Sequence, residues 1–274
     1  MAVRDEQIIA ELGLRRDRSW SIYDYPNLIR CASVLCFLVA WEIYGRRTDP
    51  LLLTYPTAVV GAAFQLIRTG ELLRQLLSSL STLGVGFGLS VIFGVGFGLV
   101  MGRSRIAEAV LDPHMNALYA TPQVALIPLF MMWFGLGFMV KAVVVFLFAF
   151  FPILINTASG VRNVSNSTIE VGRAYMANER QILLKVVFPA TLPFIMAGVR
   201  LAVGRAIVGM VVAELFTAIT GLGAMLTLYG NLFETAKMFV VIIVLGLLGV
   251  GLIRATQALE KRMARWKETE RATQ

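Results

Sequence analysis

Residues 76–101, LLSSLSTLGVGFGLSVIFGVGFGLVM, decide the fold class of this chain. The run contains no charged residue, and a membrane-spanning helix needs about 20 consecutive, mostly apolar residues. Glycines recur within it and at its end, largely at four-residue steps: Gly84, Gly88, Gly94, Gly98 and Gly102. This spacing predicts a helix face without side chains, against which a neighbouring helix backbone can approach closely.

The composition of the whole chain also indicates a membrane protein. Hydrophobic residues make up 57% of the sequence, charged residues make up 15%, and the mean hydropathy is +0.74. A soluble domain carries about 25% charged residues, and its core could not absorb this much apolar surface. No linker separates the apolar runs, which favours one membrane domain over residues 28–258 with tails at 1–27 and 259–274. The polar first tail is not expected to be a cleaved signal peptide.

The other apolar runs predict an all-α membrane protein with about six transmembrane helices. The expected spans are residues 28–44, 76–101, 115–134, 142–161, 194–213 and 238–258. The uncharged run 215–233 is also long, but Gly221, Gly223, Gly230 and Asn231 favour a loop with a short helix or a re-entrant turn.

The positions of lysine and arginine favour one orientation in the membrane. These residues are concentrated in segments 4–30, 103–105, 162–185 and 254–271. The positive-inside rule then places both termini and residues 162–190 in the cytoplasm. The net charge of +8 fits basic loops beside an anionic leaflet better than nucleic-acid binding, because no basic face with interleaved aromatic residues lies outside the spans.

One polar and amphipathic segment, residues 167–189 (STIEVGRAYMANERQILLKVVFP), interrupts the apolar chain. Ser167 and Glu170 have the spacing of a capping box, in which the hydroxyl and the carboxylate satisfy free backbone donors. The segment is therefore expected to begin a helix at Thr168.

The second half of this segment predicts a tight bend and another short helix. Asn178 is expected to end the first helix in a left-handed turn. Residues 179–188 then form the second helix, which Pro189 stops because proline has no backbone donor. A polar hairpin of this kind is suited to docking onto something outside the bilayer.

The hairpin resembles the EAA loop of ABC-importer permeases, a Glu-Ala-Ala segment followed by a glycine and an aliphatic-x-Leu-Pro ending. The matching positions are Glu170, Val171, Gly172, Met176, Val186, Phe188 and Pro189. Val171 and Gly172 stand where the family has alanine, Met176 where it has glycine, and Phe188 where it has leucine. In that family this loop inserts into a groove on a cytoplasmic ATPase.

Four further segments resemble the permease branch that serves nitrate, taurine, aliphatic sulfonate, bicarbonate and similar importers. They are TYPTAVVGAAFQLIRTGEL (54–72), GRSRIAEAVLDPHMNALYATPQVALIPLFMMWFGLG (102–137), FFPILINTASGVRNV (150–164) and GVRLAVGRAIVGMVVAEL (198–215). Several blocks in the right order are more specific than one motif.

The resemblance implies a type I ABC-importer permease fold in the bacterial inner membrane. It implies the transmembrane subunit of an ATP-driven importer for a small polar solute, with an anion favoured. The implied partners are a second permease copy, two cytoplasmic ATPase subunits that bind ATP and Mg, an external or periplasmic solute-binding protein, and membrane lipid. Within the hairpin, 166–190, the residues implied in ATPase coupling are Glu170, Val171, Gly172, Ala174, Tyr175, Met176, Ala177 and Pro189.

A transport pathway is expected near breaks in the apolar helices. Pro122 and Pro128 interrupt the span 115–134, and each removes a backbone donor, so the freed carbonyls need other partners or a water-filled path. Each break could equally be a structural kink, as could the one at Pro152. The pathway candidates are Thr121, Pro122, Gln123, Asn156, Arg205 and Glu214.

Charged residues within the expected spans are few. We expect Glu42 to reach the interface by snorkelling. Arg200 and Arg205 could snorkel or cap carbonyl groups, and Arg205 could alternatively contribute positive potential to an anion path. Glu214 could gate the path, pair with Lys237, or face water.

Small residues in the span 194–213 form a second stripe. Gly198, Ala202, Ala206, Gly209 and Ala213 follow one another at steps of three or four. The stripe predicts a packing face, either against another span of this chain or against a second copy.

Other chemistry finds little support in the sequence. Cys31 and Cys36 match no metal or redox motif, and His114 is the only histidine. No Gly-rich loop ends in Gly-Lys-Ser/Thr, so we expect no ATP binding, no catalytic residue and no metal site in this chain. The alternative function is a secondary transporter or channel without an ATPase, which the scarcity of intramembrane carboxylates disfavours.

Overall fold

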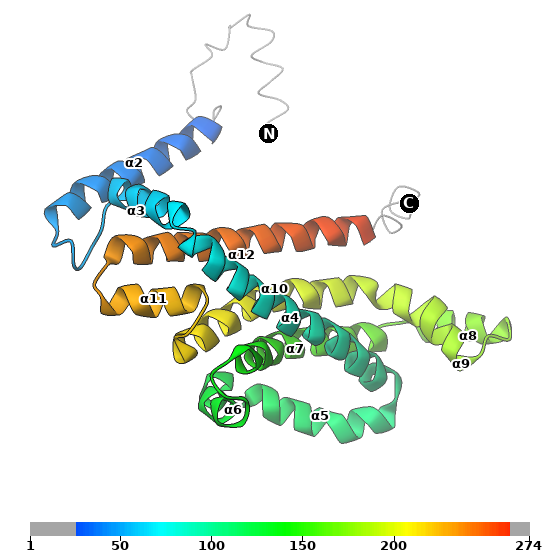
Figure 1. The fold of residues 1–274 in the computed structure, drawn as a ribbon. Helices are drawn as coiled ribbons and strands as arrows, with labels where there is room; N and C mark the ends of the chain where they lie inside the picture. The colour runs from blue at the N-terminus through cyan, green and yellow to red at the C-terminus, as the bar shows by residue number, and fades with distance from the viewer. Residues whose placement is uncertain (1–25, 264–274) are drawn as a thin grey trace, which may run out of the picture.

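The computed structural model describes residues 26–263, and every regular element within them is a helix (Figure 1). Of the expected tails, 1–27 and 259–274, residues 1–25 and 264–274 lie outside the described residues. In chain order the elements are α2 (Pro26–Arg47), α3 (Pro56–Arg68), α4 (Glu71–Arg103), α5 (Arg105–Ala120), η2 (Gln123–Leu126), α6 (Ile127–Phe134), α7 (Phe138–Arg162), α8 (Asn166–Ala174), α9 (Glu179–Ile182), η3 (Leu183–Val187), α10 (Phe188–Thr217), α11 (Leu222–Asn231) and α12 (Thr235–Met263).

Four helical runs in the described part of the chain are long and apolar enough to cross a membrane: α4, α7, the continuous run Glu179–Thr217, and α12. A fifth span is formed if α5 and the η2–α6 segment count as one, although the two halves are bent by 89°. The break expected at Pro122 is therefore confirmed. The first expected span corresponds to α2, which carries both acidic and basic side chains and is not among these runs, so its crossing of the membrane stays a prediction.

Helix α7 lies between α4 and α10, and small residues on both neighbours allow the close approach. On α4, a Cβ added at Gly94 or Gly98 would lie within 3.0 Å of Ile153 or Thr157 of α7. The predicted glycine face is thus confirmed for this part of the helix. It is wrong for Gly84 and Gly88, which have no neighbouring atoms within 4 Å because they lie on another side of α4.

The small-residue stripe of α10 also packs within the chain. A Cβ at Gly198 would lie 2.8 Å from the Cβ of Asn156, and one at Gly209 would lie 2.9 Å from the Phe148 ring, both on α7. Ala202, Ala206 and Ala213 are fully buried as well. Of the two alternatives for this stripe, the structure shows packing against another span of the same chain.

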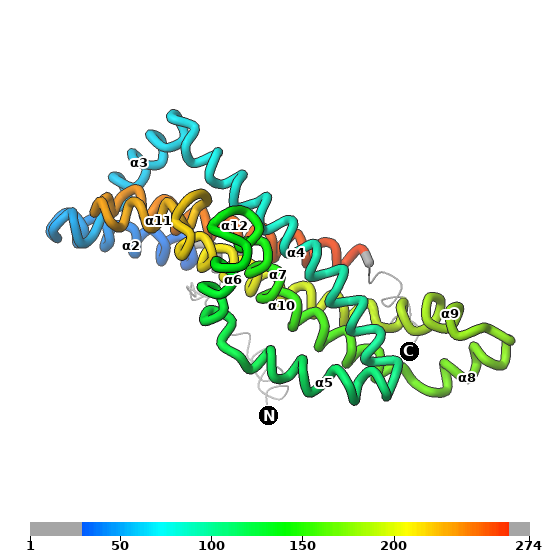
Figure 2. The backbone as a smooth tube through the Cα atoms, turned by 60° about the horizontal axis from the view of Figure 1, so that its bottom comes forward, coloured from blue at the N-terminus to red at the C-terminus, as the bar shows by residue number. Residues whose placement is uncertain are grey.

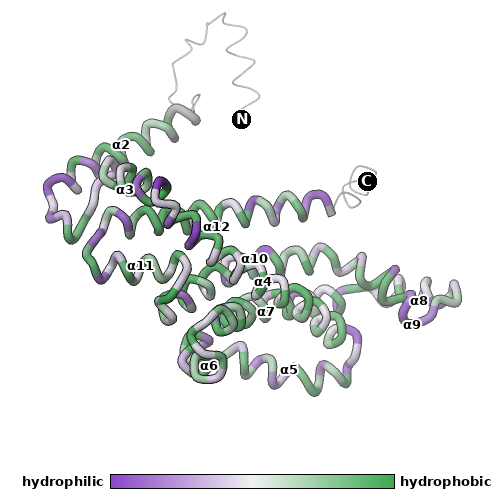
Figure 3. Tube along the Cα trace, in the orientation of Figure 1, coloured by the Kyte–Doolittle hydropathy of each residue, from purple (hydrophilic) through white to green (hydrophobic). Residues whose placement is uncertain are grey.

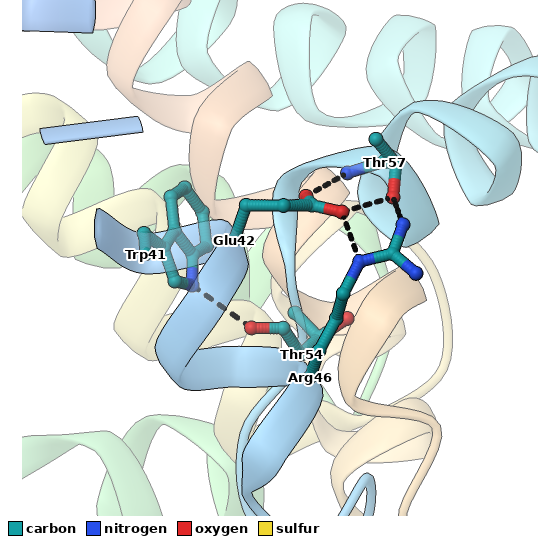
Figure 4. Close-up of polar contacts among 5 residues, drawn as sticks. All are labelled: Trp41, Glu42, Arg46, Thr54 and Thr57. Carbon is teal, nitrogen blue, oxygen red and sulfur yellow. Dashed lines mark hydrogen bonds and ion pairs between the residues drawn. The ribbon is translucent and has the colours of Figure 1, made fainter. Parts of the chain in front are cut away.

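A polar cluster joins α2 to α3 and explains the carboxylate in the otherwise apolar α2 (Figure 4). The Glu42 carboxylate accepts hydrogen bonds from the Thr57 backbone N–H at 3.0 Å, the Thr57 hydroxyl at 2.7 Å and Arg46 Nε at 2.6 Å. Trp41 Nε1 donates to the Thr54 carbonyl at 2.8 Å. Glu42 therefore caps the first turn of α3, where Tyr55 offers no side-chain cap, rather than simply reaching the interface.

Residues 215–233 do not form a span. Helix α10 continues to Thr217, and α11 is only 10 residues long. A helix of this length reaches about 15 Å, half the thickness of a hydrocarbon core of about 30 Å. The expectation of a loop with a short helix is confirmed.

The polar ends of the molecule contrast with its apolar middle. Figure 3 shows hydrophilic residues on α8 and α9, where the hairpin leads into α10. It shows them again toward the end of α12. Figure 2 shows α5 leaving the end of α4 at an angle, and Leu111 and Met115 of α5 pack against an apolar cluster of α4 and α7. The α8–α9 hairpin therefore projects from the apolar helices as a separate polar feature.

Candidate functional site

The first helix of the hairpin begins two residues earlier than the sequence predicted. Ser165 is the N-cap of α8, and its hydroxyl accepts a hydrogen bond from the Thr168 backbone N–H at 3.3 Å. Ser167 lies inside the first turn, and its hydroxyl is 3.2 Å from that of Ser165. The capping box of Ser167 and Glu170 is therefore wrong, because the earlier serine occupies the extended cap position.

The bend between the two helices uses a different residue from the one expected. Met176 has the left-handed conformation, with φ of 57°, at the position where the resembling family has glycine. Asn178 is extended and begins α9 instead. Its side chain accepts from the Gln181 backbone N–H, and the Gln181 side chain accepts from the Asn178 N–H, each at 2.9 Å. The left-handed turn expected at Asn178 is therefore wrong, because Met176 makes the turn and Asn178 caps the second helix.

Pro189 does not stop the second helix, contrary to the prediction. The π-helical turn η3 follows α9 directly, and α10 begins at Phe188 with Pro189 in its first turn, where a backbone donor is not needed. The run Glu179–Thr217 is 39 residues long. At 1.5 Å per residue this is about 58 Å, well beyond a hydrocarbon core of about 30 Å. One arm of the hairpin is therefore the polar end of a membrane-spanning helix.

The hairpin packs on the body of the molecule through a small apolar cluster. Ile182 and Val187 are fully buried, and they pack with Val161 at the end of α7. Gly172 faces the second arm, where an added Cβ would lie 3.5 Å from Ile182 Cγ1. The hairpin is therefore in contact with the end of α7 and continuous with α10.

Ion pairs connect the same region to α4 and α5. Glu179 pairs with Arg103 at 2.5 Å and with Arg173 at 3.1 Å, and Arg162 pairs with Glu108 at 2.7 Å. The hydrogen bond from Arg173, together with the nearby Arg103, lowers the pKa of the Glu179 carboxyl. Sequence reasoning missed these pairs because their members are up to 76 residues apart.

The outward face of the hairpin carries unusually exposed apolar side chains. Met176 is 93% exposed, Tyr175 83% and Val171 56%. Glu170 and Ala174 are exposed, Ala177 is partly buried against the apolar cluster, and Pro189 is partly buried. Exposed apolar residues on a polar hairpin are typical of a surface that contacts a protein partner.

The pathway candidates at the helix break lie together. Thr121 ends α5, and its hydroxyl donates to the Ala117 carbonyl at 2.9 Å. Pro122 is exposed and Gln123, which begins η2, is partly buried. These three residues mark the bend of 89° between α5 and the η2–α6 segment.

The other pathway candidates are not brought to that bend. The Asn156 side chain donates to the Pro152 carbonyl at 2.8 Å, next to Gly198 in the contact between α7 and α10. Arg205 is exposed on α10, and Arg200 pairs with Glu260 at 3.3 Å.

Glu214 has a different environment from the one the sequence suggested. Its side chain is fully buried, so it does not face water. It does not pair with Lys237, which pairs with Glu234. The carboxylate instead accepts hydrogen bonds from Ser79 and from the Gly223 backbone.

Within residues 26–263, no group of three or more His, Cys, Asp or Glu side chains is placed to hold a metal ion. Cys31 and Cys36 are exposed free thiols.

Known proteins are similar to this chain in sequence and in fold. Residues 90–265 match the family "binding-protein-dependent transport system inner membrane component". A putative aliphatic sulfonates transport permease protein of Bacillus subtilis is 33% identical over 85% of each chain. The riboflavin transport system permease protein of Chloroflexus aurantiacus is 33% identical over 92% of this chain and 95% of its own, and the formylaminopyrimidine transport permease protein of Halalkalibacterium halodurans is 30% identical over 86% and 94%.

Solved structures agree at the level of the fold. The MetNI methionine ABC transporter in an inward-facing conformation has a chain that matches with a TM-score of 0.53 at 21% identity, covering 71% of this chain and 94% of that one. This chain therefore belongs to the binding-protein-dependent transport inner membrane components, the permease subunits of ABC importers, and has their type I fold. The resemblance inferred from the sequence is confirmed, and the chain is a multi-pass inner-membrane permease and not an ATPase.

Proposed function

We propose that this permease imports a small polar anion, such as nitrate, a sulfonate or taurine, or bicarbonate, and that the hairpin 166–190 couples import to ATP hydrolysis on separate subunits. The observation that carries the coupling role is the hairpin itself. Its exposed Val171, Tyr175 and Met176 provide a contact surface, and its second arm is continuous with α10. A push on this surface acts directly on a spanning helix.

The anion is favoured by charge and by the relatives. Arg205 supplies a positive charge on α10, and a relative that is 33% identical is described as a transporter of aliphatic sulfonates, which are anions. Other relatives are described as transporting riboflavin and formylaminopyrimidine. The substrate class is accordingly the part of the proposal that needs the first experiment.

The proposed assembly contains two copies of this chain, two ATPase subunits that bind ATP and Mg, and an external or periplasmic binding protein. Family membership supports the ATPase and binding-protein partners. The ATPases would contact Glu170, Val171, Tyr175 and Met176 on the cytoplasmic side, with both termini on that side. Alternating access then requires two states of the assembly that nucleotide and solute stabilise differently.

The proposed pathway passes the helix break. Thr121, Pro122 and Gln123 lie where the backbone turns by 89°, and a broken helix at membrane depth leaves polar groups for a solute or water. Arg205 and Asn156 are the further candidates on α10 and α7.

The function is tested by co-purifying the chain with the ATPase and binding protein encoded beside it and reconstituting the complex in proteoliposomes. Sulfonates, nitrate and bicarbonate are each supplied with the binding protein, and ATP hydrolysis and uptake are measured together. The proposal expects one anion to stimulate both. Stimulation only by uncharged or cationic solutes would overturn the anion assignment, and uptake without ATP would overturn the coupling.

Orientation is tested separately by cysteine labelling after Cys31 and Cys36 are replaced. A cysteine near Gly172 should react only from the cytoplasmic side, and a cysteine near Asn231 only from the outside. Labelling of both positions from one side would contradict the proposed topology.

A further inference from the structure

We propose that Glu214 is a positioning residue that fixes α11 to the adjoining ends of α4 and α10, so that these three elements move as one unit during the transport cycle. The uptake, ATP-hydrolysis and vanadate-trapped measurements below rest on the proposed function, whereas the nucleotide-free distances do not. The proposal concerns the end of α10 opposite the hairpin.

The Glu214 carboxylate connects the three elements directly. It lies in the last turn of α10 and is fully buried. The Ser79 hydroxyl of α4 is 2.8 Å and 2.9 Å from its two oxygens, and the Gly223 backbone N–H of α11 donates to it at 2.9 Å. A negative charge at the N-terminus of a helix is also favourable toward the helix dipole.

Besides the Gly223 N–H, two more backbone donors at the start of α11 find partners on α4. The Leu222 N–H donates to the Ser79 hydroxyl at 2.8 Å, and the Gly221 N–H donates to the Gln75 side-chain oxygen at 2.8 Å. We call these residues the Glu214 cluster: Gln75, Ser79, Glu214, Gly221, Leu222 and Gly223. Side chains from other helices therefore hold the start of α11, because the N-cap residue, Gly221, has no side chain that could accept these hydrogen bonds.

Close packing reinforces the hydrogen bonds. Gly221 has φ of 106°, and an added Cβ would lie 2.1 Å from a Glu214 carboxylate oxygen. A Cβ at Gly223 would lie 2.6 Å from the Glu214 Cβ. Only glycine at these two positions lets the backbone of α11 reach the carboxylate.

The far end of α11 is attached to α4 as well. The Tyr229 hydroxyl donates to a Glu71 carboxylate oxygen at 2.8 Å, at the first residue of α4. Between the two ends, Leu222 and Met225 are buried in a core shared with α3 and α12. Both ends of α11 and its middle are thus held.

Helix α7 contributes through Lys141. This side chain is 3% exposed, and its ammonium donates to the Thr220 carbonyl at 3.2 Å and to the Thr220 hydroxyl at 2.7 Å. The bonds fix the connection between α10 and α11 and place a positive charge near the buried carboxylate. A buried charge needs this kind of compensation.

These contacts determine how α11 can move. A lid-like rotation of α11 away from α4 would strand the carboxylate of Glu214 and three backbone donors inside the protein. Unpaired buried groups of this kind are strongly disfavoured. Conformational change between access states is therefore expected elsewhere, with α11 carried along by α4 and α10.

The experiment uses spin labels on the reconstituted complex, with Cys31 and Cys36 replaced. Labels at the exposed Leu73 of α4 and Leu228 of α11 report their separation by pulsed electron resonance. The wild-type distance distribution should be the same without nucleotide and after vanadate trapping. A shift of about one helical turn, ~5.4 Å, between the two states would overturn the proposal.

Variants then test Glu214 itself. Glu214→Leu should broaden the distribution and lower uptake about tenfold, within the usual range for coupling effects, while ATP hydrolysis continues. Glu214→Gln keeps an acceptor for the Gly223 N–H and should retain most of the uptake. If the negative charge of Glu214 instead acted on the solute pathway, this variant would lose uptake. If Glu214→Leu fails to fold, Ser79→Ala removes the same link and should broaden the distribution in the same way.

The matched control is Glu234→Gln, which removes a surface carboxylate near α11 and should change neither measurement. Unchanged distributions in both Glu214→Leu and Ser79→Ala would overturn the proposal. Loss of uptake in Glu214→Gln equal to that in Glu214→Leu would also overturn it. Because the nucleotide-free distances need no transport, they test the inference even if the proposed substrate or coupling is wrong.

Discussion

The helical run Glu179–Thr217 is held in opposite ways at its two ends. At the hairpin end, the Glu179 side chain is 64% exposed and pairs with two arginines in contact with solvent. At the other end, Glu214 is fully buried and bonded to Ser79 and Gly223. The hairpin end is exposed at the surface, and the Glu214 end is buried in the interior.

The two ends differ in how easily they can change partners. Exposed ion pairs contribute only about 0–1 kcal/mol, because water and salt screen them, so they can be exchanged for contacts with another protein. A buried carboxylate that loses its partners is left without solvation, which costs several kcal/mol. We therefore expect the hairpin to respond to a partner and the Glu214 cluster to stay fixed.

The largest expected effect comes from Gly221→Val in the Glu214 cluster. The β-branched side chain would collide with the Glu214 carboxylate at a backbone φ of 106°. A strained backbone alone costs about 1–3 kcal/mol, and the displaced carboxylate adds to this. The variant should fail to accumulate in membranes or should lose several degrees of thermal stability in detergent. Normal accumulation and melting would show that this end is as adaptable as the hairpin.

At the hairpin end, Ser165→Ala should lower stability by about 1 kcal/mol, because it removes the cap of α8. Glu170→Ala should have little effect on stability, since Glu170 is not the cap. Circular dichroism melts of the purified permease compare the two variants. A larger loss in Glu170→Ala than in Ser165→Ala would restore the capping box expected from the sequence.

Glu170→Lys tests the docking surface without changing the fold. Reversing this exposed charge should weaken co-purification of the ATPase and lower ATP-driven uptake, while the thermal stability of the permease alone stays within about 0.5 kcal/mol of wild type. Arg180→Glu, on the neighbouring arm, is a control for general charge effects. Retained association and uptake in Glu170→Lys would remove this residue from the coupling surface.

Met176→Gly tests the left-handed turn of the hairpin. Glycine relieves the positive φ of 57° at the bend, where nothing else fills the space, so the local strain falls by about 1 kcal/mol. The same change removes the most exposed apolar side chain of the hairpin. We expect equal or higher stability with weaker ATPase association, measured by melting and by pull-down with the purified ATPase.

The smallest expected effect is the pH response of the Glu179 pairs. The pKa of Glu179 is lowered, so its pairing is fully present above the pKa of a free glutamate, about 4.3, and is lost as pH falls through the lower folded value. Arg103→Gln should reduce this acid sensitivity of hairpin order, measured by hydrogen exchange of residues 166–190 between pH 3 and pH 6. An unchanged acid response in Arg103→Gln would mean that the pair contributes nothing to holding the hairpin.

The sequence was most reliable where one chemical property repeats over many residues. Apolar length predicted α4, α7, α10 and α12, and Pro122 predicted the break between α5 and the η2–α6 segment, whereas Pro128 lies in the first turn of α6. The small-residue stripe of α10 correctly indicated a packing face, although only the structure shows that α7 lies against it.

Sequence reasoning failed where a single side chain chooses among nearby partners. Ser165 and Ser167 are both suitable caps, and only the backbone conformation before α8 decides between them. Pro189 looked like a helix end, yet the π-helical turn before it lets the helix continue. Local patterns allow both outcomes, and the packing of Ile182 and Val187 selects one.

The amino-acid sequence alone therefore shows that this chain is an all-helical membrane protein with a polar hairpin, because burial in lipid and exposure to water act on every residue of a segment. The tertiary structure decided what the isolated charges do. Glu42 caps α3 across 15 residues, and Glu214 meets Ser79 across 135. A carboxylate in an apolar helix must find hydrogen-bond donors, but which donors it finds depends on helices that only the folded chain brings together.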